Sequence, residues 1–322
     1  MSWLSKRLGC AGRPSRRILG HLSELVPAFP DSVGPQVGLS ADELERLCAE
    51  FQLEELTRYL GLTGGIVECA WWGSALGDIA LSTRTPPGGE NVLQEAALFH
   101  LGFQLFDVVV DTVPAHKREL ASALRPELLK TRLLHPVEPL NRLHSEDRAV
   151  ALIVRLFDAA LSSAGQRLCG DETHATYAGH LLERMYASEL QISPDLFAAK
   201  RLPVVFLGVL AIHPSNVQAT ALFAHLSLFL SLWDDWADLS EDMLQGAPNA
   251  FLSSTNGSRT RRTLEYAARS VTRVAAGRAA HGDIVTKLRE PLSAALALGV
   301  EFGPESHAKI VAICRHLIRN ES

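Results

Sequence analysis

The sequence lacks a net positive charge, a cysteine framework and a membrane-length apolar run. Its 322 residues carry 31 Lys and Arg against 36 Asp and Glu, so no overall positive field attracts nucleic acid or an anionic membrane. The five cysteines are far apart and include no CxxC pair, which disfavours a disulfide framework or a zinc ribbon and favours a reducing, cytoplasmic location. The longest apolar runs, 202–212 and 226–233, are shorter than the ~20 residues of a bilayer span, so no transmembrane segment is predicted.

The composition and the hydrophobic periodicity predict a folded protein built from helices. Hydrophobic residues make up 47% of the chain, which is typical of a packed globular domain. Ser40 and Glu43 match a capping box, after which Leu44, Leu47 and Phe51 recur at three- and four-residue steps. No run of alternating β-branched residues predicts a strand. The predicted helices are 40–60, 66–82, 90–112, 116–134, 146–168, 173–191, 194–212, 215–244, 260–280, 284–299 and 305–319.

These helices predict an all-α fold with one large bundle over residues 39–322. The helices that end at Asp111 and Asp238 are apolar on more than one face, as expected at the centre of a bundle. Residues 1–38 contain several Pro and Gly and are expected to form an arm outside it. Residues 1–22 are basic and contain no acid, which leaves two alternatives, a solvated arm or a transit peptide.

Two clusters of aspartates stand in strongly apolar helical segments. Asp107 and Asp111 are four residues apart, so their carboxylates share one helix face. Asp234 and Asp238 repeat this spacing, with Asp235 beside the first. Like charges so placed need a compensating cation, and oxygen ligands without His or Cys suit Mg²⁺. The alternative is that each cluster is a solvated helix end.

The two clusters resemble the aspartate-rich motifs of the trans-isoprenyl diphosphate synthases. In the first motif of that family a His precedes DDxxD by seven positions, as His100 precedes Asp107, and Asp111 matches the last aspartate. Residues 234–238, with the Gly/Pro turn at 245–249, resemble the second motif. Lys200 resembles the lysine of the helix that contacts the allylic diphosphate. The resemblance covers roughly residues 60–255 and implies a bundle of the isoprenoid synthase type with a central cavity.

The sequence departs from that family at three places. Val108 replaces the second aspartate of the first motif and leaves a DxxxD, which resembles the metal motifs of class I terpene synthases. Residues 64–67 stand where GGKxxR would lie and lack its basic residues, and Lys117 and Arg118 stand where the family has a double Arg. One diphosphate site is therefore expected to be retained and the other lost.

This asymmetry favours a Mg²⁺-dependent terpene synthase, a carbon-oxygen lyase that ionises one linear prenyl diphosphate and releases a terpene hydrocarbon or alcohol plus diphosphate. Ionisation needs positive charge at the leaving group and a dry pocket lined by aromatic rings. The predicted metal ligands are Asp107, Asp111, Asp234, Asp235 and Asp238, of which Asp107, Asp111 and Asp234 are also assigned as catalytic. The predicted diphosphate-binding residues are Lys200, Lys117, Arg118 and Arg201. The predicted pocket residues are Phe103, Phe106, Phe229 and Trp233, for each of which ordinary core packing is the alternative.

Two other interpretations remain open on the sequence. A chain-elongating trans-prenyltransferase would keep the fold, but the missing basic residues of GGKxxR argue against it. A non-catalytic helical partner of such an enzyme would fit the incomplete first motif, but it would have little reason to retain three aspartates in the second. The resemblance also implies a homodimer, while chain length and product skeleton depend on the shape of the cavity.

Overall fold

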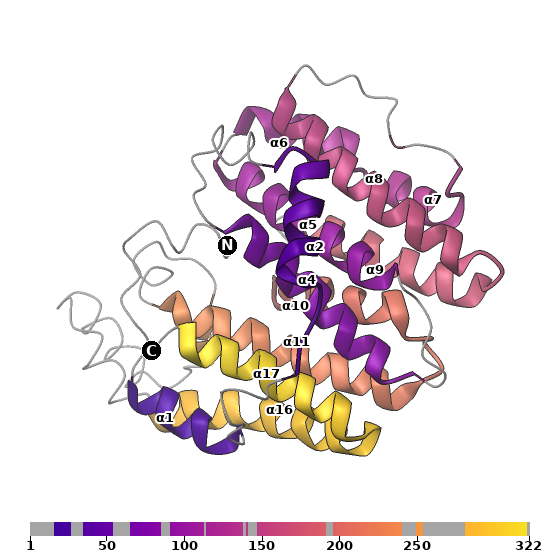
Figure 1. Ribbon diagram of the computed structural model, residues 1–322. Coiled ribbons are helices and arrows are strands. Elements are labelled where there is room, and N and C mark those ends of the chain that lie inside the picture. Colours follow the sequence, from indigo (N-terminus) through magenta and orange to yellow (C-terminus); the bar gives the residue numbers. More distant parts are fainter. Residues whose placement is uncertain are drawn as a thin grey trace. The chain divides into compact units, whose positions relative to one another are not determined.

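The computed structural model confirms an all-α protein, because the residues that it describes form helices and no strand (Figure 1). The described residues are 16–26, 35–53, 65–84, 91–112, 114–137, 140, 147–190, 196–239, 249–253 and 281–320. The helices are α1 (Arg16–Leu25), α2 (Ala41–Glu50), α4 (Ile66–Ser82), α5 (Val92–Thr112), α6 (Pro114–Ala123), α7 (Pro126–Leu134), α8 (Arg148–Leu168), α9 (Glu172–Leu190), α10 (Leu196–Ala211), α11 (Val217–Ala237), α13 (Ala250–Ser253), α16 (His281–Phe302) and α17 (Pro304–Asn320).

The chain divides into two compact units. The first comprises Met1–Leu8 and Gln36–Thr220, and the second comprises Gly9–Pro35 and Ala221–Ser322. The division falls inside α11, four residues after that helix begins. The first aspartate cluster therefore belongs to one unit and the second cluster to the other.

Local sequence signals explain where several helices begin. The capping box predicted before α2 is confirmed: the Ser40 side chain accepts from the Glu43 N–H, and the Glu43 carboxylate accepts from the Ser40 N–H at 2.8 Å. The predicted helix 116–134 is instead divided into α6 and α7. Arg125 has an extended ψ of 137° because it precedes Pro126, which takes the first position of α7.

In the first unit, α4 and α5 cross at very short range. Small residues make this possible, because a methyl group at Gly73 would lie 2.3 Å from the Ala96 carbonyl oxygen. One turn later, a methyl group at Gly77 would meet the Ala96 side chain at 3.0 Å. The crossing places His100 of α5 beside α4, where its Nδ1 lies 2.8 Å from the Cys69 carbonyl oxygen.

Helix α5 is joined to α8 by a buried ion pair. The carboxylate of Glu95 is 1% exposed, lies 2.5 Å from Nη2 of Arg167 and accepts a 2.8 Å hydrogen bond from the Ser163 hydroxyl. Further along, Gly102 lets α5 approach Leu156 and Phe157 of α8. A buried carboxylate is tolerated when it is paired and hydrogen-bonded, so these contacts fix the orientation of α5.

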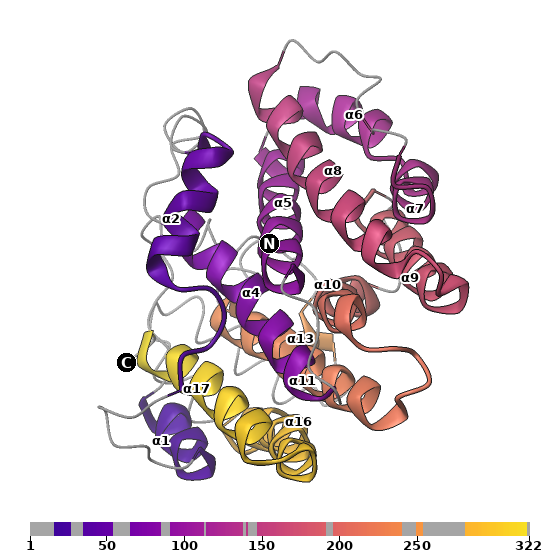
Figure 2. The ribbon, with the colours of Figure 1, turned by 45° about the vertical axis from the view of Figure 1, so that its right-hand side comes forward.

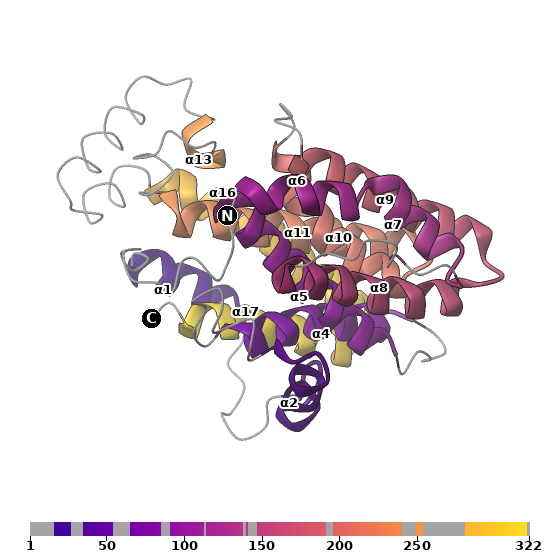
Figure 3. The same ribbon diagram turned by 90° about the horizontal axis from the view of Figure 1, so that it is seen from above.

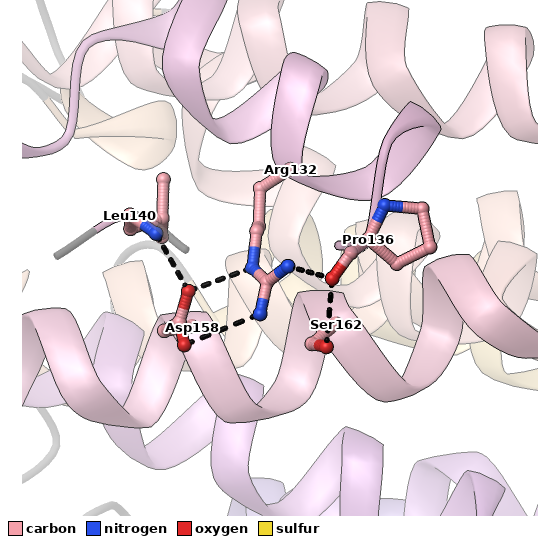
Figure 4. Close-up of polar contacts among 5 residues, drawn as sticks. All are labelled: Arg132, Pro136, Leu140, Asp158 and Ser162. Carbon is pink, nitrogen blue, oxygen red and sulfur yellow. Dashed lines mark hydrogen bonds and ion pairs between the residues drawn. The ribbon is translucent and has the colours of Figure 1, made fainter. Parts of the chain in front are cut away.

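Helices α7, α8 and α9 lie side by side in the same unit (Figure 2). Arg132 of α7 pairs with Asp158 of α8, with Nε 2.7 Å from Oδ1 (Figure 4). The same guanidinium donates to the Pro136 carbonyl, and Oδ1 of Asp158 also accepts from the Leu140 N–H at 2.8 Å. The pair thus holds the chain that follows α7 against α8.

The second unit contains α1, α16 and α17, which pack together. Ile18 and Leu22 of α1 are completely buried, as is Leu288 of α16. Part of the predicted N-terminal arm therefore forms a packed helix. The short helix α13 lies beside the beginning of α16 (Figure 3).

Candidate functional site

Asp107 lies near the end of α5 among buried apolar side chains. The residue is half-buried, whereas Phe106 before it is fully enclosed and Val108 after it is 6% exposed. Asp111 belongs to the same helix one turn later, and its side chain lies outside the described residues. The helical spacing keeps Asp107 and Asp111 on one face, as the sequence predicted.

An aromatic cluster lies beside Asp107 in the first unit. The rings of Phe103 and Phe106 contact the ring of Tyr186 on α9, with centroids 6.3 Å and 5.2 Å apart. Phe157 of α8 approaches the same tyrosine ring edge-on at 5.6 Å. Phe103 keeps 6% of its surface exposed, whereas Phe106 keeps none. Their role in lining a substrate pocket stays a prediction.

The directions of α5, α9 and α10 follow from contacts between them. His174, near the beginning of α9, donates from Nε2 to the Val209 carbonyl near the end of α10, so these two helices run antiparallel. Tyr186 lies 12 residues after His174, at the level of the first turns of α10. Because Phe106 contacts Tyr186, the end of α5 lies at this same end of the unit.

Two predicted diphosphate ligands therefore stand at the same end of the first unit as Asp107. Lys200 and Arg201 occupy the second turn of α10, and both are half-buried. The Nε atom of Arg201 is buried and has no hydrogen-bond partner among the described residues. A buried donor without an acceptor costs about 1–3 kcal/mol, so this atom points to an acceptor that the described residues do not supply.

The other two predicted diphosphate ligands belong to α6. Arg118 is exposed to solvent, and the side chain of Lys117 lies outside the described residues. Their role in binding diphosphate stays a prediction.

The second aspartate cluster lies at the end of α11, in the second unit. Asp234 is half-buried, whereas Asp235 and Asp238 are 1% and 2% exposed. Asp234 and Asp238 are one turn apart, and the Asp238 N–H donates to the Asp234 carbonyl at 3.0 Å. Asp234 is thus the more exposed carboxylate, and Asp235 and Asp238 are both buried.

Aromatic rings precede this second cluster along α11. The centroid of Trp233 lies 5.9 Å from that of Phe229 and 5.3 Å from that of Trp236. Phe229 is fully buried, Trp233 is 1% exposed and Trp236 is 7% exposed. The predicted pocket residues Phe229 and Trp233 thus pack against aromatic neighbours, and their contact with a substrate stays a prediction.

Asn249 and Lys287 complete the surroundings of the second cluster and were not predicted from the sequence. Asn249 is 1% exposed, and its side chain accepts from the Phe251 N–H at 2.9 Å, as a helix N-cap does. Its amide also donates to the Asp235 carbonyl at 2.5 Å. An asparagine just before a helix was a visible capping signal. Lys287 of α16 donates from Nζ to the Ala250 carbonyl at 3.3 Å. No local sequence signal predicted this contact.

The described residues contain no group of three or more His, Cys, Asp or Glu side chains arranged to hold a metal ion. A magnesium ion commonly uses only one or two protein carboxylates, with water and substrate phosphate as its other ligands. The oxygen donors of Asp107 and Asp234 have the chemistry of such ligands. Asp107 lies in the first unit and Asp234 in the second.

In the part of the chain that the structure describes, two helices are long and apolar enough to cross a membrane by length and composition alone. The window Val92–Val109 is 83% buried and the window Arg148–Leu168 is 56% buried inside the protein. Core helices of a soluble protein satisfy the same criteria, and the burial of both windows fits that role.

Comparison of the chain with protein-family models, with curated proteins and with solved structures finds no match.

Proposed function

We propose that the protein is a Mg²⁺-dependent terpene synthase that ionises a single linear prenyl diphosphate and releases a terpene hydrocarbon or alcohol plus diphosphate. The observation that carries the proposal lies in the first unit. Asp107 stands at the same end as Lys200 and Arg201, and Arg201 has a buried donor without an acceptor among the described residues. A carboxylate for a cation and two positive groups for an anion fit a metal-diphosphate ligand.

In this proposal the aspartates bind and orient the leaving group through metal. Asp107 and Asp234 are the half-buried carboxylates of the two clusters, and Asp111 and Asp238 stand one turn after each of them. When bound, Mg²⁺ supplies electrostatic stabilisation of the negative charge that develops on the diphosphate. The aspartates fix where that charge is stabilised.

Lys200 and Arg201 bind the phosphate oxygens directly. A guanidinium presents several donors in a fixed plane, and phosphate oxygens are strong acceptors for it. Binding there would give the Arg201 Nε–H the acceptor that the described residues do not supply. Both cations would also stabilise the diphosphate as it leaves.

The aromatic side chains exclude water from the carbocation and stabilise it. Phe103, which is 6% exposed, stands one turn before Asp107, and its ring contacts those of Phe106 and Tyr186. An aromatic face stabilises a nearby cation by about 0.5–2 kcal/mol. Phe229 and Trp233 are proposed to serve the same purpose in the second unit.

The charge of the Gly64–Asp78 segment favours this reaction over chain elongation. Elongation needs a second diphosphate site with several Lys or Arg donors. The only charged residues of this segment are two acids, Glu68 and Asp78. The Asp78 carboxylate is already used, since it accepts from the Gly38 N–H at 3.0 Å. The proposal extends to an isoprenoid-synthase-type bundle with a central cavity, to a homodimer and to a cytoplasmic location.

Replacing Asp107 or Asp234 by Ala tests the proposal. Each variant should lower the rate of diphosphate release from a prenyl diphosphate by at least about 10²-fold, because a ligand of the charge-stabilising metal is lost. The midpoint temperature of thermal unfolding without Mg²⁺ should stay the same or rise slightly, since removing one of two neighbouring like charges relieves repulsion.

Glu45→Ala, at an exposed acid of α2, is the matched control and should keep the wild-type rate. Full activity of the Asp234→Ala variant would remove the second cluster from the mechanism, and full activity of Asp107→Ala would remove the first.

A further inference from the structure

Among the three aspartates at the end of α11, Asp235 contacts the segment that begins at Asn249. Its side chain is 1% exposed, and its Oδ2 accepts from the backbone N–H of Ala250 at 3.0 Å. Its own carbonyl accepts from the side chain of Asn249 at 2.5 Å. One residue of α11 thus holds two consecutive residues that lie 14 and 15 positions further along the chain.

The held segment is bound from a third element as well. Lys287 of α16 donates from Nζ to the Ala250 carbonyl at 3.3 Å, and the same ammonium lies 5.4 Å from the ring centre of Phe251. Both peptide groups of Ala250 are therefore engaged, the N–H by Asp235 and the carbonyl by Lys287. Phe251 is 4% exposed, so the segment is also anchored by an apolar side chain.

We propose that Asp235 is a positioning residue and not a metal ligand: it fastens the segment Asn249–Phe251 to the end of α11 and leaves Asp234 as the carboxylate of the pair that binds metal. The inference rests on the proposed function for its statement about Asp234. It replaces the prediction from the sequence, which assigned both aspartates to the metal.

Two physical arguments separate these neighbours. Magnesium gives up its water reluctantly and normally keeps several water ligands, which a side chain with 1% exposure does not accommodate. The Oδ2 atom of Asp235 already accepts from the Ala250 N–H at 3.0 Å, so a metal at this oxygen would compete with that hydrogen bond. Asp234 is half-buried and lies about 100° away around the helix, so the argument from burial does not apply to it.

The test compares Asp235→Asn and Asp235→Ala with Asp234→Asn in the full chain. The first readout is hydrogen exchange of the Ala250 amide, which requires no catalysis. Asparagine keeps an acceptor oxygen, so Asp235→Asn should stay within about threefold of the wild-type exchange rate, whereas Asp235→Ala should raise it about tenfold or more. Asp234→Asn should leave this rate unchanged. An unchanged rate in Asp235→Ala would show that the proposed fastening does not exist.

The second readout is turnover of a linear prenyl diphosphate as a function of Mg²⁺ concentration. Asp234→Asn should lose about 10²-fold or more in kcat, whereas Asp235→Asn should lose about threefold at most, with half-maximal activity at a similar Mg²⁺ concentration. A loss in Asp235→Asn as large as in Asp234→Asn, with Ala250 exchange like wild type, would make Asp235 a metal ligand. If the wild-type protein turns over no prenyl diphosphate, the proposed function fails while the exchange readout still decides the fastening role.

Discussion

His100 shows at the scale of one residue how packing accounts for a motif position. Its imidazole is buried at the crossing of α4 and α5, and Nδ1 lies 2.8 Å from the Cys69 carbonyl oxygen. Because a carbonyl oxygen only accepts, Nδ1 carries the proton and the ring is held as a neutral tautomer. Burial lowers the pKa of His100 from 6.5 to about 4. The residue that precedes the first aspartate cluster thus serves the contact between two helices.

Acid should destabilise the protein through His100. The unfolded chain binds a proton on this side chain below pH 6.5, whereas the folded protein binds it only below about pH 4. The stability contributed by the neutral imidazole is therefore present above pH 6.5, and roughly 3 kcal/mol of it is lost as the pH falls to 4. Burial also lowers the pKa of His174, which adds a loss of the same sign.

Urea unfolding of the wild type and of His100→Asn at pH 7 and at pH 4 measures this contribution. The variant should lose clearly less stability than the wild type between the two pH values, because it lacks one titrating group. Equal losses in the two proteins would show that His100 does not titrate differently on folding.

At the scale of elements, the first unit depends on the close approach of α4 and α5. Gly73 faces the Ala96 backbone so closely that any side chain would force the two helices apart. The same crossing positions His100. It also positions the helix α5, which carries Asp107 near its end. The position of the first cluster therefore depends on a glycine more than 30 residues before it.

Gly73→Ala should destabilise the protein by about 1–3 kcal/mol or more, because the new methyl group would lie 2.3 Å from the Ala96 carbonyl oxygen. Gly20→Ala in α1 is the matched control, since a methyl group there has no atom within 4 Å. The control should be neutral or stabilise the protein by about 0.5–1 kcal/mol. Urea unfolding of both variants measures the difference, and similar stabilities would contradict the close crossing.

Sequence signals were sufficient for elements whose beginnings are encoded locally. The capping box at Ser40 is confirmed, and the predicted helix 66–82 agrees with α4. The prediction of one helix over 116–134 was wrong, although Pro126 signals the break, because the residue before a proline is disfavoured in the helical conformation. The predicted helix 260–280 lies outside the described residues.

Contacts between distant segments could not be predicted in the same way. The ring centroids of Phe99 in α5 and Phe206 in α10 lie 4.4 Å apart. Neither local sequence predicts that these two residues are in contact. The same applies to Lys287, which reaches the segment after the second aspartate cluster from α16. The sequence predicted candidate residues for the chemistry, whereas tertiary packing decided their exposure, as in the difference between Asp234 and Asp235.

At the scale of the whole molecule, the chemistry proposed here draws on both compact units. The first unit provides Asp107 with Lys200 and Arg201, and the second provides Asp234 and its neighbours. The proposed reaction ionises one prenyl diphosphate. The segment Gly64–Asp78 offers no basic residue for a second one. We therefore expect the protein to consume a single prenyl diphosphate without a second diphosphate substrate.

Product analysis with labelled isopentenyl diphosphate tests this central claim most directly. The purified full chain is incubated with Mg²⁺ and each linear prenyl diphosphate in turn, with and without the labelled compound, and the products are identified by mass. The account predicts a neutral terpene and free diphosphate from one prenyl diphosphate, at a rate that isopentenyl diphosphate does not increase. Label in a chain-lengthened diphosphate would contradict it in favour of elongation, and no consumption of any prenyl diphosphate would contradict it in favour of a non-catalytic partner.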